Sequence, residues 1–247
     1  MNAIILVAGK GTRLRPLTYD NHKCLTEVNG QKIIENALTN LNNIGVKRVT
    51  LVIGYLGQQI KDTIDYSWQN MQINYVENKD YDTTNTSASL LLGLHEALND
   101  DLLLLEGDVF FEAKALERLL VDNYKAATLL EKYNPTLDGS FVEVSKEGYV
   151  IDWVHKSARR EGYIISDKYK TVNIHYFSKE IVKNVLLWAV ENSVQRYDGS
   201  EPIEFVMRRI VQENPNTVKA IVLNGEKWFE IDDMNDLRVA EKIFAHN

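Results

Sequence analysis

The sequence predicts an α/β fold: a doubly wound, mostly parallel sheet with a strand-rich insertion in the second half of the chain. Two observations predict it. In the first half, short continuous apolar runs alternate with segments of helical periodicity, and this alternation is typical of parallel strands with helices on both faces. After about Ala126, closely spaced strand patterns replace the alternation. We expect a single domain over residues 1–247, without internal repeats.

Four apolar runs in the first half predict buried strands: Ala3–Ala8, Val49–Tyr55, Ile73–Val76 and Leu102–Leu105. A strand that is apolar on both faces is typical of a parallel sheet. The helical segments between these strands are Ile33–Ile44, Gln58–Ile64 and Thr86–Leu98. In a Rossmann-like sheet of this kind, ligands bind beyond the carboxyl ends of the strands.

The second half is richer in strands. Strand patterns cover Thr128–Tyr133, Phe141–Ser145, Tyr149–Trp153, Lys170–Phe177 and Val218–Leu223. The residues between Ser145 and Tyr149 suit a hairpin turn. Helical periodicity predicts helices over Lys179–Asn192, Pro202–Glu213 and Met234–Ala245, and the last of these closes the domain.

Composition and charge exclude several classes of protein. The net charge is −7, from 28 basic and 35 acidic side chains, whereas a nucleic-acid-binding protein is expected to carry a basic face. The single cysteine, Cys24, allows no internal disulfide and no zinc cluster. The N-terminal apolar run is too short to span a bilayer and lacks the basic region of a signal peptide. We therefore expect a cytoplasmic protein with neither nucleic acid nor membrane as a partner.

A glycine-rich turn follows the first strand, within Leu6–Thr18 (LVAGKGTRLRPLT). Glycines let backbone N–H groups surround a phosphate. The turn is not the dinucleotide fingerprint, because Leu14 stands where the third glycine would be, and it lacks the Gly-Lys-Ser/Thr ending of a Walker A loop. Taken alone, Gly9 and Gly11 are equally consistent with an ordinary strand-to-helix turn.

Two cations near the turn favour a triphosphate ligand. The charge of a triphosphate must be neutralised, most of all at the phosphorus that is attacked, and Arg13 and Lys23 are available for this. Neither has an obvious structural partner in the sequence. We therefore expect both to serve chemistry rather than folding.

Carboxylates cluster in two places about 120 residues apart. The run Leu102–Asp108 (LLLLEGD) places Asp108 where a buried strand emerges, and Trp228–Leu237 (WFEIDDMNDL) places acidic residues just before the closing helix. Carboxylates of this kind hold Mg²⁺ together with phosphate oxygens and water, although turn and capping aspartates are also common. Asp233 suits the helix cap, which leaves Asp232 as the second candidate ligand.

A run of amide and hydroxyl side chains, Tyr81–Leu90 (YDTTNTSASL), starts the third helix. At least one of these residues must cap the helix. The same groups both donate and accept hydrogen bonds, as recognition of a pyrimidine base requires. Asn85 and Ser89 are four residues apart, so a helix would place them on one side.

The glycine turn resembles the signature of the nucleotidylyltransferase superfamily, in which a G-x-G-T-R-L-x-P-L-T stretch precedes a lysine. The resemblance runs from Met1 to about Phe244 and implies a Mg²⁺-dependent enzyme. It implies that the triphosphate is wrapped by Gly9, Gly11, Thr12 and Arg13, and that Asp108 and Asp232 hold the metal. Lys23 would hold the α-phosphate or the phosphate of an acceptor. Sugar-phosphate members usually have Lys-Pro where this chain has Lys23-Cys24.

Three stretches resemble the small cytidylyltransferases that activate phosphocholine or 2-aminoethylphosphonate. They are the W-Y-E-I-D-D-like Trp228–Asp233, the Thr84-Asn85-x-x-x-Ser89 run, and Tyr169–Ile174 (YKTVNI), which is similar to the phosphonate-activating enzymes. Glucose-type enzymes usually carry a glutamine and Gly-Thr-Ala in place of the Thr84-Asn85-x-x-x-Ser89 run. The resemblance implies CTP as the nucleotide and a small phosphorylated or phosphonylated amine as the acceptor.

The expected site follows from these stretches. Residues 1–125 would form the nucleotide-binding half, and residues 126–247 the acceptor-binding half with the closing helix. The expected catalytic residues are Arg13 and Lys23. The expected nucleotide contacts are Leu6, Ala8, Gly9, Lys10, Gly11, Thr12, Arg13, Tyr81, Thr84, Asn85, Ser89 and Glu106. The expected acceptor contacts are Lys23, Lys156, Asn173 and Glu204.

Two other functions stay open on the sequence. A sugar-1-phosphate nucleotidylyltransferase using UTP, dTTP or GTP would share the glycine turn and differ in the base and acceptor regions. A nucleotide-binding regulatory subunit without catalysis would be expected to lack Lys23 or the metal carboxylates, and this chain has both. A homodimer is also left open.

Overall fold

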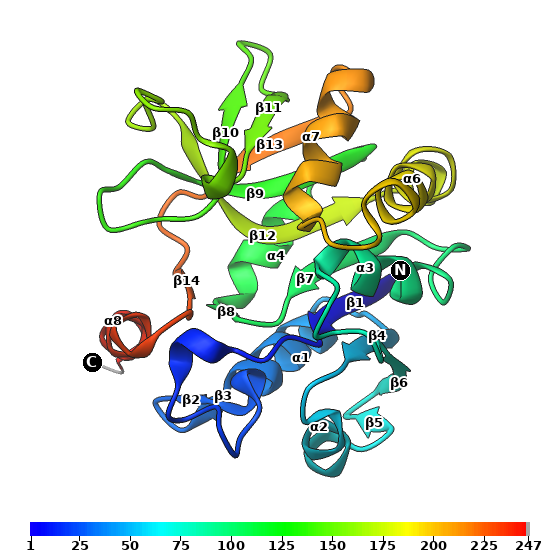
Figure 1. Cartoon of the computed structure of the whole chain (residues 1–247), viewed down its shortest axis with the longest axis vertical. Coiled ribbons are helices and arrows are strands. Elements are labelled where there is room, and N and C mark those ends of the chain that lie inside the picture. Colours follow the sequence, from blue (N-terminus) through cyan, green and yellow to red (C-terminus); the bar gives the residue numbers. More distant parts are fainter. Residues whose placement is uncertain (246–247) are drawn as a thin grey trace.

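Four parallel strands form the centre of the molecule (Figure 1). In the computed structural model, which describes residues 1–245, they are β1 (Asn2–Val7), β4 (Arg48–Ile53), β6 (Met71–Glu77) and β7 (Leu102–Glu106). β1 lies between β7 and β4, with Ile4 paired to Leu104 on one side and to Thr50 on the other. All six residues of β1 are buried, as its continuous apolar run predicts.

Strands of the second half extend this sheet to ten strands. They are β9 (Ala126–Lys132), β10 (Phe141–Val144), β11 (Val150–Val154), β12 (Tyr169–Phe177) and β13 (Val218–Val222), and the short β5 (Ser67–Trp68) forms the opposite edge. The order is β11-β10-β12-β7-β1-β4-β6-β5, with β9 beside β12 and β13 beside β9. β12 runs antiparallel to β7, so the parallel core continues into a mixed, strand-rich part. The predicted fold class is confirmed.

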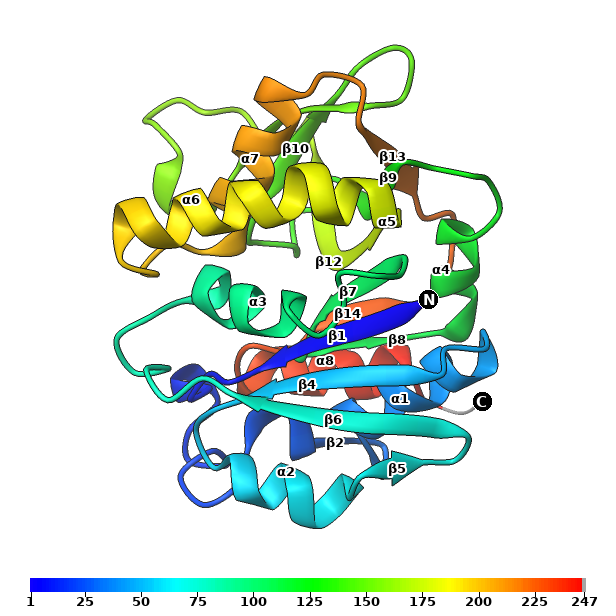
Figure 2. The same cartoon turned by 90° about the vertical axis from the view of Figure 1, so that its right-hand side faces the viewer.

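Helices cover both faces of the sheet (Figure 2). They are α1 (Ile33–Asn43), α2 (Gly57–Ile64), α3 (Thr86–Leu94), α4 (Ala113–Leu119), α5 (Lys179–Ile181), α6 (Leu187–Tyr197), α7 (Ile203–Glu213) and α8 (Met234–Ile243). Alternate side chains of β1 belong to different cores: Ile5 lies in the cluster that contains Leu38 of α1, and Ile4 in the cluster that contains Leu90 of α3. α3 and α6 pack side by side on the second face.

Several elements differ from the sequence prediction. A two-stranded ribbon of β8 (Val109–Phe111) and β14 (Trp228–Glu230) was not predicted, and neither were α4 and the small hairpin of β2 (Glu27–Val28) and β3 (Gln31–Lys32). The helix predicted over Lys179–Asn192 contains a π-helical turn at Val182–Leu186 and continues to Tyr197. The ribbon matters for the site, because it brings the acidic segment around Asp232 beside the end of β7.

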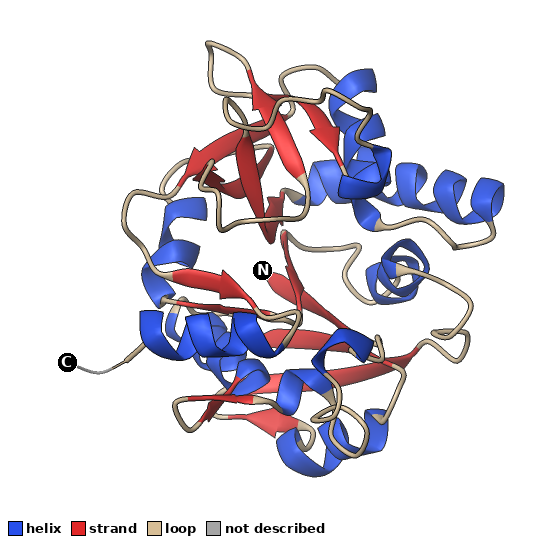
Figure 3. Ribbon diagram, turned by 60° about the vertical axis from the view of Figure 1, so that its left-hand side comes forward, coloured by secondary structure: helices blue, strands red, loops and turns tan. Residues whose placement is uncertain are grey.

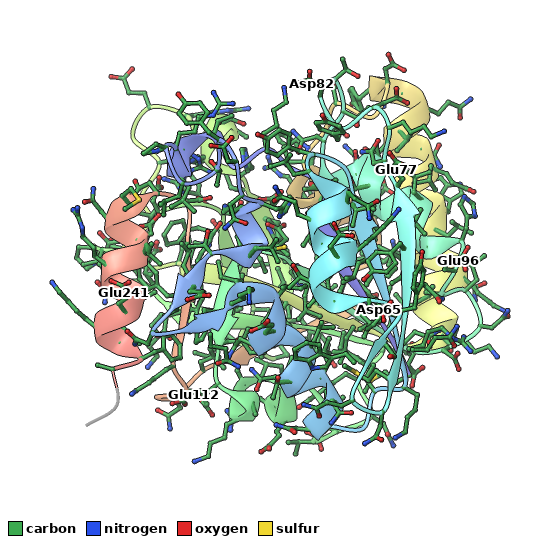
Figure 4. All side chains as sticks on the ribbon, turned by 90° about the horizontal axis from the view of Figure 1, so that it is seen from below. Asp65, Glu77, Asp82, Glu96, Glu112 and Glu241 are labelled. Carbon is green, nitrogen blue, oxygen red and sulfur yellow. The ribbon has the colours of Figure 1, made fainter. Side chains whose placement is uncertain are left out.

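The N-terminus starts inside the sheet, whereas the chain leaves α8 at the edge of the molecule (Figure 3). None of the helices within residues 1–245 is long and apolar enough to cross a membrane. The acidic side chains labelled in Figure 4 come from separate segments and are spread across that view, so they form no single patch.

Candidate active site

The glycine turn and Lys23 pack directly against each other. Gly11 has a φ of 58°, which glycine adopts without strain. A Cβ atom at Gly11 would lie 2.9 Å from Cβ of Lys23. Thr18 donates a hydrogen bond of 2.8 Å to the Gly11 carbonyl and holds the turn from the other side. Glycine at this position therefore allows the backbone of the turn to approach the lysine.

Lys23 joins carboxylates from two distant parts of the chain. Its Nζ lies 2.9 Å from Oδ2 of Asp108 and 2.8 Å from Oδ1 of Asp232. A guanidinium nitrogen of Arg13 lies 2.8 Å from the same Asp232 oxygen. Burial lowers the pKa of Lys23, but the two carboxylates raise it more, so the net shift is upward and the side chain is a cation. The expectation that Arg13 and Lys23 lack structural partners is wrong.

The local structure around α8 sets Asp232 apart from its acidic neighbours. The Asp233 carboxylate accepts hydrogen bonds from the N–H groups of Asn235 and Asp236. Asp236 in turn accepts the N–H groups of Asp232 and Asp233, each at 3.0 Å. This is a capping box, and the predicted cap at Asp233 is confirmed. The side chain of Asp232 takes no part in it and faces Lys23 and Arg13.

The acidic residues here have the properties of a cation site. Oδ1 of Asp108 is buried and has no hydrogen-bond partner among residues 1–245, and a buried oxygen in that state is costly unless a ligand satisfies it. Carboxylate oxygens of Glu106, Asp108 and Glu230 lie within 4.8 Å of one another. Oxygen ligands at such spacing fit a divalent cation. Glu230 was not among the predicted site residues, although it stands in the WFEIDD stretch.

A buried polar layer lies behind this cluster. Lys170 is only 1% exposed, and its Nζ donates to Glu230 at 2.9 Å and to the Thr171 carbonyl at 2.7 Å. The side-chain amide of Asn173 donates to both Glu106 and Glu230, at 3.3 and 3.4 Å. Burial raises the pKa of Glu106 well above its usual value, and nearby carboxylates raise it further. Burial also raises the pKa of Glu230, against the opposing effect of Lys170.

The other predicted acceptor residues lie at the rim of this layer. Glu204 accepts a hydrogen bond of 2.9 Å from Ser140, and its charge raises the pKa of Glu106 more than the charge of any other carboxylate does. Lys156 is exposed and lies 3.7 Å from a carboxylate oxygen of Asp138. Of the four predicted acceptor contacts, the structure thus brings Lys23, Asn173 and Glu204 near the acidic cluster, and Lys156, at the start of a short 3-10 helix, lines the same cavity as Glu230.

The residues predicted to contact the base differ in their exposure and in their hydrogen-bond partners. Asn85 is the N-cap of α3: its side-chain oxygen accepts the Thr86 N–H at 2.8 Å, and the residue is exposed. Ser89 is buried, and its hydroxyl accepts a hydrogen bond of 3.0 Å from Asn78. Asn78 also donates to the Thr84 hydroxyl at 3.1 Å. Asn78 precedes the polar run, so no sequence pattern singles it out.

The polar run Tyr81–Leu90 begins beside the end of β1. A Cβ atom on Gly54 would lie 2.7 Å from the Ala8 carbonyl and 2.8 Å from Cβ of Tyr81, so Tyr81 lies beside Ala8. Lys10 forms an ion pair with Asp82. The carbonyl of Leu6 accepts the Gly107 N–H at 3.0 Å. The predicted nucleotide contacts of β1, the glycine turn and the polar run therefore border one region.

Two cavities meet at the ion-pair cluster. One, of about 220 Å³, lies between the glycine turn, Lys23 and Asp108. The other, of about 170 Å³, extends past Lys170 and Glu230 towards Lys156. Arg13 and Asp232 line both. The arrangement gives two neighbouring compartments, one beside the glycine turn and one beside the buried polar layer.

Comparison with known proteins identifies the family. The family model described as nucleotidyl transferase matches residues 2–246. The chain belongs to the nucleotidyl transferase family. The resemblance seen in the sequence is thus confirmed, and cytidylyltransferases are among the relatives of this nucleotidyl transferase.

Three similar proteins illustrate this. A CMP-5'-(3-aminopropyl)phosphonate synthase of Streptomyces rubellomurinus is 29% identical over 99% of this chain and 39% of its own length. A CTP:phosphoglutamine cytidylyltransferase of Campylobacter jejuni is 28% identical over 97% of this chain and 98% of its own length. The structure of the inositol-1-phosphate CTP transferase from T. maritima matches with a TM-score of 0.74 at 21% identity, over 99% of this chain and 96% of that one. The chain thus spans about two fifths of the first relative and nearly all of the second.

Proposed function

We propose that this nucleotidyl transferase is a Mg²⁺-dependent cytidylyltransferase that transfers CMP from CTP to a small phosphorylated or phosphonylated amine and releases pyrophosphate. The observation that carries the proposal is the cluster in which Lys23, Asp108 and Asp232 meet beside the glycine turn. It combines a fixed cation with carboxylates at the end of a parallel strand, where sheets of this type bind ligands.

The choice of nucleotide is supported by relatives and by the base region. Both relatives described above are named for CTP or CMP. Asn85 is exposed beside the start of α3, and its side-chain N–H₂ group remains available because only its oxygen serves the cap. Ser89 and Thr84 would act through the bonds that Asn78 makes to them. A base site built from such groups rejects a base that leaves them unpaired.

The choice of a primary amine is supported by the buried polar layer. An ammonium group favours carboxylates, and this layer holds Glu230, which is paired with Lys170, together with Glu106, whose pKa is raised by burial and by the charges of Glu204 and Glu230. A quaternary amine would favour an aromatic cage. The sequence offers Tyr81, Trp153 and Tyr197 for such a cage, but Trp153 is buried and Tyr197 of α6 packs beneath Arg209 of α7. This favours 2-aminoethylphosphonate or a similar acceptor over phosphocholine.

The proposed reaction is an in-line attack of an acceptor oxygen on the α-phosphorus of CTP. A new P–O bond forms to the acceptor, the bond to the β-phosphate breaks, and pyrophosphate leaves without a covalent enzyme intermediate. Lys23 would lie between the two reacting anions and reduce their repulsion, and Arg13 would neutralise the leaving group. Mg²⁺ held by Asp108 and Asp232 would neutralise further charge on the triphosphate when bound.

Asp108 and Asp232 suit this role better than the two glutamates. Glu106 and Glu230 are already engaged by Asn173 and Lys170. The two aspartates are also engaged, by Lys23, but the buried Oδ1 of Asp108 has no hydrogen-bond partner among residues 1–245 and is the oxygen that a cation would satisfy. The two glutamates would then serve the acceptor.

A screen of pyrophosphate release tests the proposal. CTP, UTP, dTTP, GTP and ATP would each be combined with 2-aminoethylphosphonate, phosphocholine, phosphoethanolamine and glucose-1-phosphate, with and without Mg²⁺. We expect turnover with CTP and a primary-amine acceptor to exceed all other pairs by at least about tenfold in kcat/KM. Equal turnover with UTP or dTTP would overturn the choice of CTP. A preference for glucose-1-phosphate would replace this proposal with a sugar-1-phosphate nucleotidylyltransferase.

A further inference from the structure

His22 is a buried residue of the candidate site that neither the sequence nor the proposed reaction uses. It is 2% exposed and immediately precedes Lys23. Its backbone N–H donates to the side-chain oxygen of Gln59 at 3.0 Å, which fixes the main chain at this point. Its imidazole lines the cavity beside the glycine turn, together with Gly9, Gly11 and Lys23.

The neighbours of Nδ1 determine which nitrogen of the His22 imidazole carries the proton. The backbone N–H of Cys24 donates to Nδ1 of His22 at 3.1 Å, and the Cys24 sulfur lies 3.1 Å from the same nitrogen. Burial, together with the charge of Lys23, lowers the pKa of His22 to about 4, so the ring is neutral near pH 7. A neutral ring whose Nδ1 accepts a hydrogen bond carries its proton on Nε2.

The other nitrogen faces the glycine turn without a partner. Nε2 of His22 is buried and completes no hydrogen bond within the described part of the chain. Val7 and Gly9 line the same cavity as His22, and their backbone groups, Val7 more than Gly9, raise the pKa of the ring, as carbonyl oxygens do. A buried N–H beside two carbonyls, with neither bond completed, is poised to complete one after a small movement of the turn.

The turn itself has backbone N–H groups that are free to bind a ligand. Among residues 1–245, the backbone N–H groups of Lys10, Gly11 and Thr12 have no hydrogen-bond acceptor. Consecutive free N–H groups in a glycine turn form an anion-binding concavity. Their direction depends on the preceding peptide, because the C=O and N–H of a trans peptide point to opposite sides.

We propose that His22 is a positioning residue for the nucleotide: its Nε2–H holds the Gly9 carbonyl and so directs the Lys10 N–H, and the turn after it, towards the triphosphate. This inference rests on the proposed function, because it requires a nucleoside triphosphate at the glycine turn. His22 touches no reacting atom and acts through the backbone. It should therefore affect nucleotide affinity rather than the affinity for the acceptor.

Cys24 stands where the sugar-phosphate members usually have proline, and this difference fits the proposed role of His22. A proline after the lysine has no N–H, so it would leave Nδ1 of His22 without its backbone donor. Cys24 supplies that donor, and burial raises the pKa of its thiol far above the usual range, so the sulfur keeps its proton. The Cys24 N–H thus fixes the tautomer that the proposed bond requires.

Three variants separate positioning from general stability. His22→Asn keeps an acceptor for the Cys24 N–H but lacks a donor at the position of Nε2. His22→Gln keeps an N–H₂ group near the position of Nε2 but loses the acceptor near Nδ1. His175→Asn is the matched control, because His175 is also 2% exposed and bound to Thr128, yet does not line the cavity beside the glycine turn.

The measurement is the dissociation constant of CTP, by titration calorimetry of the full chain with Mg²⁺ and no acceptor, together with KM for each substrate. We expect His22→Asn to weaken CTP binding about tenfold, as loss of one hydrogen bond would, while the KM of the acceptor changes less than about twofold. His22→Gln should recover part of the loss. His175→Asn should lower the Tm but leave CTP binding within about twofold of the wild type.

The outcomes distinguish this inference from the proposed function. If the wild type binds CTP and His22→Asn binds it equally well, the positioning role is wrong and the proposed function stands. If His175→Asn weakens CTP as much as His22→Asn, the effect is general destabilisation and the role is wrong. If the wild type prefers another nucleoside triphosphate, the choice of CTP fails and the same titration with that nucleotide decides the role of His22. If the wild type binds no nucleotide, both proposals fail.

Discussion

At the scale of single residues, the sequence indicates which side chains matter but not what they contact. Lys23 stands out because it follows a glycine turn, yet its two partners are 85 and 209 residues away in sequence. Sequence patterns span only a few neighbouring residues, so they cannot indicate contacts between residues so far apart in the chain. For the same reason, the sequence predicts a role for Lys23 in the reaction alone. The structure shows that its ion pairs also join distant parts of the fold.

Lys23→Ala should therefore reduce both activity and stability. We expect kcat to fall about 100-fold or more, because the variant lacks the cation between the reacting groups. We also expect the free energy of unfolding at pH 7 to fall by about 1 to 3 kcal/mol, because Asp108 and Asp232 lose the cation that they share. Activity per folded molecule, measured well below the Tm, separates the two effects. Lys32→Ala, which breaks a half-buried pair with Glu35 one helical turn away, is the control and should change neither greatly.

The loss of stability in Lys23→Ala should depend on pH. Burial raises the pKa of Asp232, but Lys23 and Arg13 lower it more, so it lies below 3.8 in the folded protein, whereas the pKa of Lys23 lies above 10.5. The carboxylate thus contributes stability that is present above pH 3.8 and is lost as the pH falls further. The lysine contributes stability that is present below pH 10.5 and is lost as the pH rises. Denaturant unfolding should show a constant difference from the wild type between about pH 5 and 9, shrinking below about pH 4.

At the scale of elements, continuous apolar runs predict the central strands well because burial on both faces leaves a clear pattern. β1, β4, β6 and β7 all appear where these runs predict them. The ribbon of β8 and β14 escapes prediction because each strand has only three residues. Trp228–Glu230 resembles a functional motif, and its role as a strand depends on pairing with Val109–Phe111, more than 100 residues earlier.

The start of α8 gives a prediction about neighbouring aspartates. Asp233 caps the helix, whereas Asp232 faces Lys23 and Arg13. Asp233→Asn should therefore be mild, because asparagine caps helices as well as aspartate does, and Asp233→Ala should cost about 1 kcal/mol of stability. Asp232→Asn should remove most activity and weaken the dependence on Mg²⁺, as should Asp108→Asn.

Initial rates over a Mg²⁺ titration, with a Tm for each variant, measure both effects. The two asparagine substitutions at 232 and 233 are chemically identical and adjacent, so each serves as the control for the other. A severe loss of activity in Asp233→Asn with normal rates in Asp232→Asn would reverse the assignment of the two aspartates.

At the scale of the whole molecule, the site exists only because the two parts of the chain meet, and this is what the sequence predicts least. Lys170, Asn173 and Glu230 become one buried network with Glu106 through the pairing of β12 with β7 and of β14 with β8. A single lysine or glutamate in a strand gives no indication of such a network. The sequence accordingly identified the glycine turn in detail and the acceptor side only by resemblance.

A second connection between the two parts braces the start of α3. The N–H groups of Asn85 and Ser87 donate to the carbonyls of Gly199 and Glu201, at 2.8 and 3.3 Å. In the other direction, the N–H of Ile203 donates to the hydroxyl of Thr86 at 2.8 Å. The loop between α6 and α7 is thus bonded to the segment that carries Asn85, our candidate for reading the base.

Thr86→Val tests this connection, because valine has the shape of threonine without the hydroxyl. The Ile203 N–H would lose its acceptor, which should reduce the free energy of unfolding by about 1 to 3 kcal/mol. Because the loosened segment carries Asn85, the KM of CTP should rise more than the KM of the acceptor. Thr83→Val is the control: Thr83 is exposed, its hydroxyl makes a long 3.3 Å bond to the Asp80 carbonyl, and the residue should tolerate the change. Denaturant unfolding and the two KM values measure the effects. If Thr86→Val is as stable as the wild type, the brace contributes nothing. If it is less stable but both KM values are unchanged, the connection supports the fold without positioning the base region.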